Sequence, residues 1–107
     1  MQTYFCKLIA PRPTFAMDMS EEEAQIMKAH AVYWRGCMEK GNVVAFGLVG
    51  DPAGAYGIGI IEVEDAAAAR NMTDNDPTML SGRGFFYEVQ PMPFGAVHPS
   101  AAQPERA

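Results

Sequence analysis

The sequence predicts an α+β domain in which a four-stranded antiparallel sheet carries two helices on one face. Three observations lead to this prediction. The expected elements follow one another as strand, helix, strand, strand, helix, strand, and a tight turn joins the two central strands. The chain has 107 residues, which is enough for a single core. Apolar residues make up 49% of it, as in packed domains rather than disordered chains. This order of elements is that of the ferredoxin-like βαββαβ subunit.

The first strand and the first helix have clear boundaries in the sequence. Residues 3–10, TYFCKLIA, are rich in aromatic and branched side chains and are followed by two prolines, which predicts a strand that ends there. A helix is expected over residues 21–40. Ser20 and Glu23 have the spacing of a capping box at its start. Gly41 suits the left-handed position just after a helix end.

The central strands are expected at residues 43–49 and 56–64, because both segments are rich in branched apolar residues. Residues 50–54, GDPAG, join them and combine proline with glycine, which is typical of a tight reversal. Gly57 and Gly59 fall on the same face of the second of these strands and leave a strip of sheet without side chains. Close packing of a helix is the more common cause of such a strip, and a hollow that accepts a ligand is the alternative.

A short second helix is expected over residues 66–74, AAAARNMTD, with Asp65 as its cap. Pro77 ends this helix, because a residue that precedes proline disfavours helical geometry. The fourth strand is expected at residues 84–92, GFFYEVQPM, which are again aromatic and branched.

The strands alternate poorly between apolar and polar residues, which predicts that both faces of the sheet are buried. Apolar side chains fall on both faces of the second and fourth strands. Two helices cover only one face, so we expect the other to meet a second copy of the chain in a homodimeric α+β barrel. The alternative is a monomer with exposed apolar side chains, which is unusual over a whole sheet face.

The domain is expected to span residues 1–92. Residues 93–107 contain too few apolar side chains to pack by themselves, so we expect a tail that is flexible or packed on the partner subunit. His98 lies in this tail and is expected to be exposed.

Charge and motif content argue against several classes of function. The formal net charge of −5 leaves no basic surface of the kind that nucleic acid binding requires. No apolar run approaches the roughly 20 residues of a membrane span, and no signal sequence is recognisable, so we expect a cytoplasmic protein without a membrane partner. Cys6 and Cys37 have neither CxxC nor zinc-ligand spacing, so we expect buried thiols and no metal site.

An ionisable side chain lies on the inward stripe of the first helix. Ile26, His30, Tyr33 and Cys37 are spaced as one helical face, so His30 is expected to point into the domain. An inward histidine on an apolar face is most often a core residue whose ring nitrogens are satisfied by a partner. The partner therefore decides what the histidine can do.

Asp76 is the partner we expect. At about 1.5 Å per residue, His30 lies about 15 Å from the C-terminal end of its helix, and the second helix rises about 14–15 Å from that same end before Asp76. Asp74 is the nearby alternative, but it is expected to be helical and turned elsewhere. A carboxylate beside an imidazole fixes its tautomer and suits it to proton transfer, and the same contact also serves as a structural tie.

Two further residues are candidates for contacts with a substrate. Tyr33 lies one turn from His30 and is a candidate to present its hydroxyl to a ligand, although core packing is the default for such a residue. Arg83 lies in the segment SGRG and is a candidate to attract an anionic substrate, although a solvated loop arginine is more common.

The order and spacing of these features resemble the YciI-like (YCII-related) family. The resemblance covers roughly residues 2–92 and is carried by His30 in the first helix, the segment VVAFGLVGDPAGAYGIGIIEVED, the alanine-rich helix and NDP at residues 75–77. It implies a dimeric α+β barrel of ferredoxin-like subunits, with His30 and Asp76 as an active-site dyad. Leu48 and Thr78 differ from the proline and the aromatic residue that are frequent in the family at these two positions.

The resemblance also implies a range of chemistry. A related protein eliminates chloride from a chlorinated hydroxyhydroquinone, and muconolactone isomerases share the barrel. We therefore expect a lyase or isomerase that moves a proton beside the carbonyl or lactone group of a small-molecule substrate, with no metal or redox cofactor. The alternative is a non-catalytic module that binds a metabolite or acts as a dimeric interaction module.

Overall fold

The computed structural model describes residues 1–97 and contains all six elements that the sequence predicts. The strands are β1 (Gln2–Ile9), β2 (Val43–Val49), β3 (Tyr56–Val63) and β4 (Phe86–Pro91). The two predicted helices are α2 (Glu21–Glu39) and α3 (Ala66–Asp74). Two short helices that the sequence did not predict are also present, α1 (Phe15–Asp18) and α4 (Pro77–Leu80).

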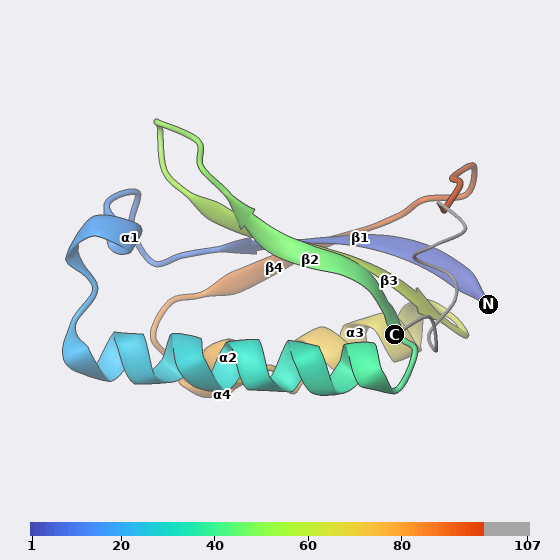
Figure 1. Cartoon of the computed structure of the whole chain (residues 1–107), viewed down its shortest axis with the longest axis horizontal. Coiled ribbons are helices and arrows are strands. Elements are labelled where there is room, and N and C mark those ends of the chain that lie inside the picture. The colour runs from blue at the N-terminus through green and yellow to red at the C-terminus, as the bar shows by residue number, and fades with distance from the viewer. Residues whose placement is uncertain (98–107) are drawn as a thin grey trace.

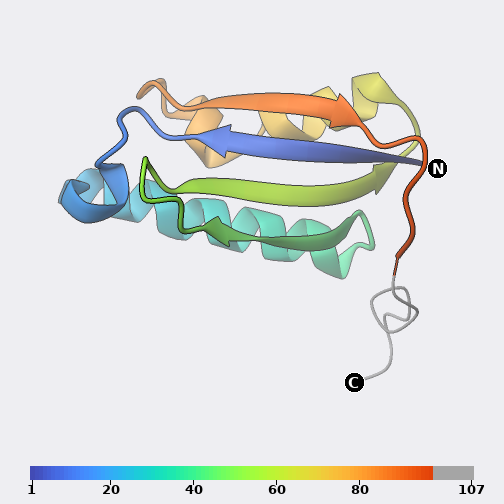
Figure 2. The ribbon, with the colours of Figure 1, turned by 90° about the horizontal axis from the view of Figure 1, so that it is seen from above.

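The strands form one antiparallel sheet in the order β2-β3-β1-β4, which confirms the ferredoxin-like arrangement. Strand β1 is central, so that Cys6 pairs with Gly59 of β3 on one side and with Val89 of β4 on the other. In Figure 2, which is seen from above, the strands lie side by side in front of the helices. Helices α2 and α3 cover the same face of the sheet, and no described element covers the other face (Figure 1).

Helix α2 begins and ends as the sequence predicts. The Ser20 hydroxyl accepts from the Glu23 amide at 3.1 Å, and the Glu23 carboxylate accepts from the Ser20 amide at 2.8 Å, which is the predicted capping box. Gly41 has a φ of 91° after the end of the helix. Arg12, from the segment after β1, donates to both oxygens of the same Glu23 carboxylate at 2.9 and 2.8 Å. The start of α2 is therefore tied to the end of β1.

The two unpredicted helices are too short to show a periodic pattern. Pro77 is expected only to end a helix, but it also occupies the first turn of α4, where its fixed φ is favourable. Helix α1 is fixed from outside: the ring of Phe15 packs edge-on against that of Phe85, with centroids 5.2 Å apart. Tertiary contacts and local capping, rather than periodicity, form these two turns.

The core lies between the sheet and the helices. On β1 every second side chain is buried, from Tyr4 through Cys6 to Leu8, on the face toward the helices. Trp34 of α2 is 2% exposed and lies over Gly59, where an added Cβ would be 2.4 Å from the indole ring. Close packing of α2 therefore explains why residue 59 is a glycine. This is the more common of the two causes expected for a strip of sheet without side chains.

The helix-free face of the sheet keeps apolar side chains in partial contact with solvent. Phe86 is 47% exposed, and Phe5, Ile58 and Ile60 are partly exposed on the same face. The second copy predicted for this face stays a prediction. His98 and the rest of the tail beyond residue 97 lie outside the described residues. Within residues 1–97, no helix has the length and apolarity needed to cross a membrane.

Candidate active site

Asp76 lies between α3 and α4, and its backbone is extended, with φ −63° and ψ 135°. Pro77 favours this extended geometry in the residue before it. The side chain caps α4, because Oδ1 accepts from the Thr78 amide at 2.9 Å. Asp76 is 0% exposed. A local turn therefore holds a carboxylate inside the domain, with its second oxygen directed at other elements.

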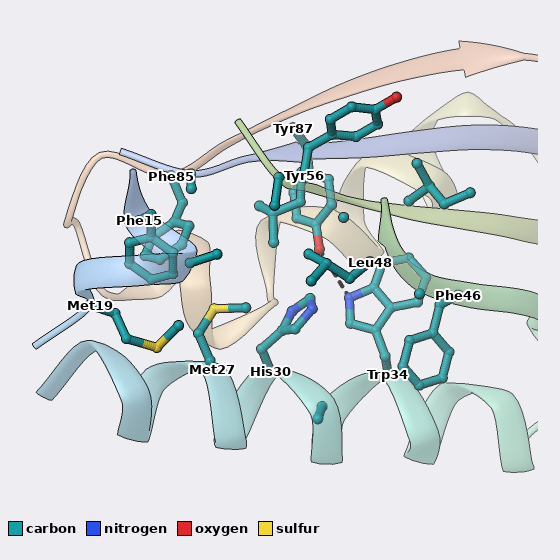
Figure 3. Close-up of a pocket in the computed structure, with 18 residues that line it drawn as sticks. Phe15, Met19, Met27, His30, Trp34, Phe46, Leu48, Tyr56, Phe85 and Tyr87 are labelled. Carbon is teal, nitrogen blue, oxygen red and sulfur yellow. Dashed lines mark hydrogen bonds between the residues drawn. The ribbon is translucent and has the colours of Figure 1, made fainter. Parts of the chain in front are cut away.

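That second oxygen, Oδ2, accepts hydrogen bonds from three side chains. His30 of α2 donates from Nδ1 at 2.7 Å, and Trp34, one turn later on the same helix, donates from Nε1 at 2.9 Å. The hydroxyl of Tyr87 on β4 makes a short hydrogen bond to the same oxygen. Trp34 Nε1 also lies 3.0 Å from the Tyr87 oxygen, a contact drawn in Figure 3. Helix α2 and strand β4 thus converge on one buried carboxylate.

The charge of Asp76 sets the direction of these hydrogen bonds. Burial would raise the pKa of its carboxyl group, but hydrogen bonds, foremost that from His30, outweigh burial and hold the pKa below the usual 3.8. Asp76 is therefore ionised at neutral pH and can only accept, so His30 Nδ1 must carry the proton that it shares. Burial and the nearby carboxylate raise the pKa of Tyr87, which keeps its hydroxyl a donor.

The other ring nitrogen of His30 has no such partner. Nε2 makes no hydrogen bond to any described residue. It is also not fully buried: within residues 1–97, the one fully buried side-chain atom without a hydrogen-bond partner is Thr78 Oγ1. The His30 side chain is 15% exposed. An imidazole that is fixed through Nδ1 and open at Nε2 has the arrangement of a general base or acid.

His30 forms part of the wall of a cavity of about 290 Å³. Figure 3 shows its ring projecting from α2 toward the sheet, between Met27 and Trp34. The rest of the wall is mainly apolar and comes from the sheet, from α2 and from the region of α1. The other lining residues are Leu8, Ala10, Phe15, Ala16, Met19, Ala31, Phe46, Gly47, Leu48, Ala55, Tyr56, Gly57, Ile58, Phe85 and Tyr87. Asp76 lies behind His30 and does not line the cavity.

The family model of the YCII-related domain matches residues 3–93, which is nearly the whole described chain. The chain belongs to the YCII-related family. The match covers all of the strands and helices except the first residue of β1, and it includes His30 and Asp76. A comparison with curated proteins found no match to this chain. Family membership therefore supports the fold, and the chemistry has to be argued from the site.

The other candidates from the sequence lie elsewhere in this YCII-related fold. Tyr33 donates its hydroxyl to the Met72 carbonyl at 2.6 Å, and burial foremost raises its pKa to about 12. Arg83 pairs with Glu22 at 3.0 Å. Neither Tyr33 nor Arg83 lines the cavity beside His30. Asp74, the alternative partner for His30, is an exposed residue at the end of α3.

The structure also shows how the potential metal-binding side chains and the two cysteines are arranged. No group of three or more His, Cys, Asp or Glu side chains within residues 1–97 is arranged to hold a metal ion. Cys6 is buried and Cys37 is half-buried, and both are free thiols. Burial foremost raises the pKa of each thiol, to about 11 for Cys6.

Sequence reasoning missed two members of the site, Trp34 and Tyr87. Trp34 follows His30 by four residues, so the helical period already places both on one face. A tryptophan that is buried needs an acceptor for its indole N–H, and this could have drawn attention to it. Tyr87 gives no comparable signal, because the mixed pattern of the fourth strand does not show which of its residues point toward the helices.

Proposed function

We propose that this YCII-related protein is a lyase or isomerase acting on a small molecule, with His30 as the general base or acid. One observation carries the proposal: His30 is fixed through Nδ1 to an ionised, buried Asp76, while Nε2 is unpaired on a residue that lines a cavity. A ring held in one tautomer beside a ligand-sized cavity is prepared to exchange a proton with that ligand.

The proposed step begins with a neutral imidazole that carries its proton on Nδ1. Its Nε2 lone pair removes a proton from a carbon beside the electron-withdrawing group of the ligand. In an elimination, the C–H electron pair forms the new double bond and the leaving group departs with its own bonding pair. In an isomerisation, His30 returns the proton to another carbon. Asp76 stabilises the imidazolium that forms in between, because its carboxylate accepts from Nδ1.

Asp76 acts as a positioning residue in this proposal, since it does not line the cavity. Trp34 and Tyr87 hold its carboxylate in place by donating to the same oxygen that His30 uses. The three donors limit where that oxygen lies, and its position in turn limits the rotation of the imidazole. This arrangement accounts for a proton-transfer group placed within an otherwise apolar wall.

A synthetic substrate tests whether His30 is available as a base. In 5-nitrobenzisoxazole a base removes the ring C–H proton, the N–O bond breaks, and a coloured cyanonitrophenolate is released. We expect His30→Gln to lower kcat about 100-fold, at the low end of the usual contribution of a general base. Asp76→Asn should lower kcat about tenfold with little change in KM, since it alters the orientation of the base rather than the cavity wall.

The chain offers a matched control, because its second histidine is His98. His98→Gln should leave the elimination rate unchanged. If the protein is instead a binding module in which the His30–Asp76 contact is a structural tie, His30→Gln will react at the wild-type rate. That result, in a variant that remains folded by circular dichroism, would contradict the proposed function.

We also propose that two copies pair through the helix-free face of the sheet. Partly exposed Phe5, Ile58, Ile60 and Phe86 support this, because a monomer would leave an apolar strip along the sheet in water. Pairing through this face would leave α2 and His30 on the outer side of each subunit. The resemblance to dimeric barrels points the same way.

A further inference from the structure

We propose that the cavity selects an uncharged, largely apolar ring compound with one hydrogen-bonding group directed at His30, and that it rejects carboxylates and phosphates. This inference deepens the proposed function, because the ligand would be the substrate of His30. It is carried by a juxtaposition: a wall of aromatic and thioether side chains surrounds one titratable group, and a buried anion lies directly behind that group.

The cavity wall contains no lysine or arginine. Arg83, the cation that the sequence suggested for an anionic substrate, is paired with Glu22 and lies outside this wall. His30 is therefore the one lining side chain able to carry a positive charge. A carboxylate ligand would lose its hydration without gaining a fixed cation, which disfavours its entry.

Among the polar side chains of the wall, His30 is the one with a hydrogen-bonding atom free to meet a ligand. The Tyr87 hydroxyl already donates to Asp76 and accepts from the Trp34 N–H. Tyr56 alternates along β3 with the residues that face the helices, and its ring lies 4.3 Å from the Lys7 amine on the opposite face of the sheet. His30 Nε2 is thus the one side-chain hydrogen-bonding atom that a ligand in the cavity meets.

Electrostatics inside the domain strengthen the preference against anions. The ionised carboxylate of Asp76 is 2.7 Å from His30 Nδ1, on the side away from the cavity. Beside a mainly apolar wall this negative charge is screened less than it would be in bulk water. The Asp76 carboxylate therefore both repels a second anion and stabilises a cationic imidazole.

The size and lining of the cavity indicate one substituted ring. An apolar protein cavity of about 150 Å³ is large enough for benzene. At about 290 Å³, this cavity has room for a ring with short substituents. Phe15, Phe46 and Trp34 offer flat surfaces to such a ring, and Met27 offers an adaptable thioether.

Binding can be followed directly, because Trp34 is the sole tryptophan of the chain and lines the cavity. The probes are 4-methylbenzamide and 4-methylbenzoate, which share a shape and differ in charge, and the amide N–H can donate to the unprotonated Nε2 of His30. Quenching of Trp34 fluorescence, checked by ligand-observed NMR, gives a Kd for each. We expect the amide to bind at least tenfold more tightly than the carboxylate at neutral pH.

A charge placed at the cavity rim provides the second arm of the experiment. Leu48 lines the cavity and is 68% exposed, so Leu48→Arg adds a cation without disturbing the core. It should tighten binding of 4-methylbenzoate about tenfold relative to binding of 4-methylbenzamide. Val32→Arg is the matched control, because Val32 is 73% exposed on α2 and does not line the cavity. It should change neither Kd.

Two results would overturn the inference: wild-type protein that binds the carboxylate as tightly as the amide, or binding of neither probe. These outcomes are separable from failure of the proposed function. Tight, selective binding of the amide, together with unchanged elimination by His30→Gln, would reject the base and keep the ligand class. Elimination that depends on His30, together with a preference for carboxylates, would keep the base and reject the ligand class.

Discussion

Replacing Asp76 with alanine tests the network on which the site depends. The substitution removes the acceptor of four hydrogen bonds, and the fate of each donor sets the cost. The Trp34 N–H keeps the Tyr87 oxygen at 3.0 Å, and His30 is exposed enough to reach water. The Tyr87 hydroxyl proton and the Thr78 amide lose their acceptors, and each such loss costs about 1–3 kcal/mol.

The expected loss in the free energy of unfolding is therefore about 2–4 kcal/mol at pH 7, since removal of a buried charge offsets part of two unsatisfied donors. Urea denaturation followed by circular dichroism measures it. Asp74→Ala is the control, because Asp74 is exposed at the end of α3, only two positions away. It should change stability by less than about 0.5 kcal/mol.

The pH dependence gives this prediction a second, independent check. The pKa of Asp76 is lowered in the folded protein from its usual 3.8. A lowered pKa contributes stability that is present above the unfolded value and is lost as the pH falls through the folded value. The difference in the free energy of unfolding between wild type and Asp76→Ala should therefore be constant near neutrality and shrink below pH 3.8. Equal stabilities at pH 7, or a gap that widens on acidification, would refute the reasoning.

Two further predictions concern packing and assembly. Gly59→Ala should lower the free energy of unfolding by about 1–3 kcal/mol and shift Trp34 fluorescence, because the new Cβ would lie 2.4 Å from the indole ring. Gly47→Ala, with no atom within 4 Å of its Cβ, should be nearly neutral. Phe86→Lys should weaken dimerisation about tenfold or more in sedimentation equilibrium, whereas Leu80→Lys on the helix side should not. A wild-type chain that stays monomeric at every concentration would contradict the second prediction.

The sequence was most informative where the signal is local. The capping box of Ser20 and Glu23 and the glycine at position 41 fix the limits of α2 to within one residue, because they involve groups within one helical turn of each other. The six main elements could be placed for the same reason. The two short helices were missed, since four residues carry no period and α1 is fixed by the distant Phe85.

For the site, the sequence could place His30 and Asp76 at a similar height, because helix length follows from residue count. The contact between them is present in the structure, and their catalytic use remains our proposal. The substrate contacts predicted for Tyr33 and Arg83 stay predictions. Their partners in the structure, Met72 and Glu22, could not be known without the packing of α3 and of the loop after α4.

The sequence by itself determined the order of elements, the ends of the long helix, the inward histidine and the carboxylate held before a proline. Only the tertiary structure decided that Trp34 and Tyr87 share the oxygen that binds His30, and that an apolar cavity lies in front of it. The physical reason is separation along the chain. His30 and Asp76 are 46 residues apart and Trp34 and Tyr87 are 53 apart, so their contacts depend on how sheet and helices pack rather than on any neighbouring residue.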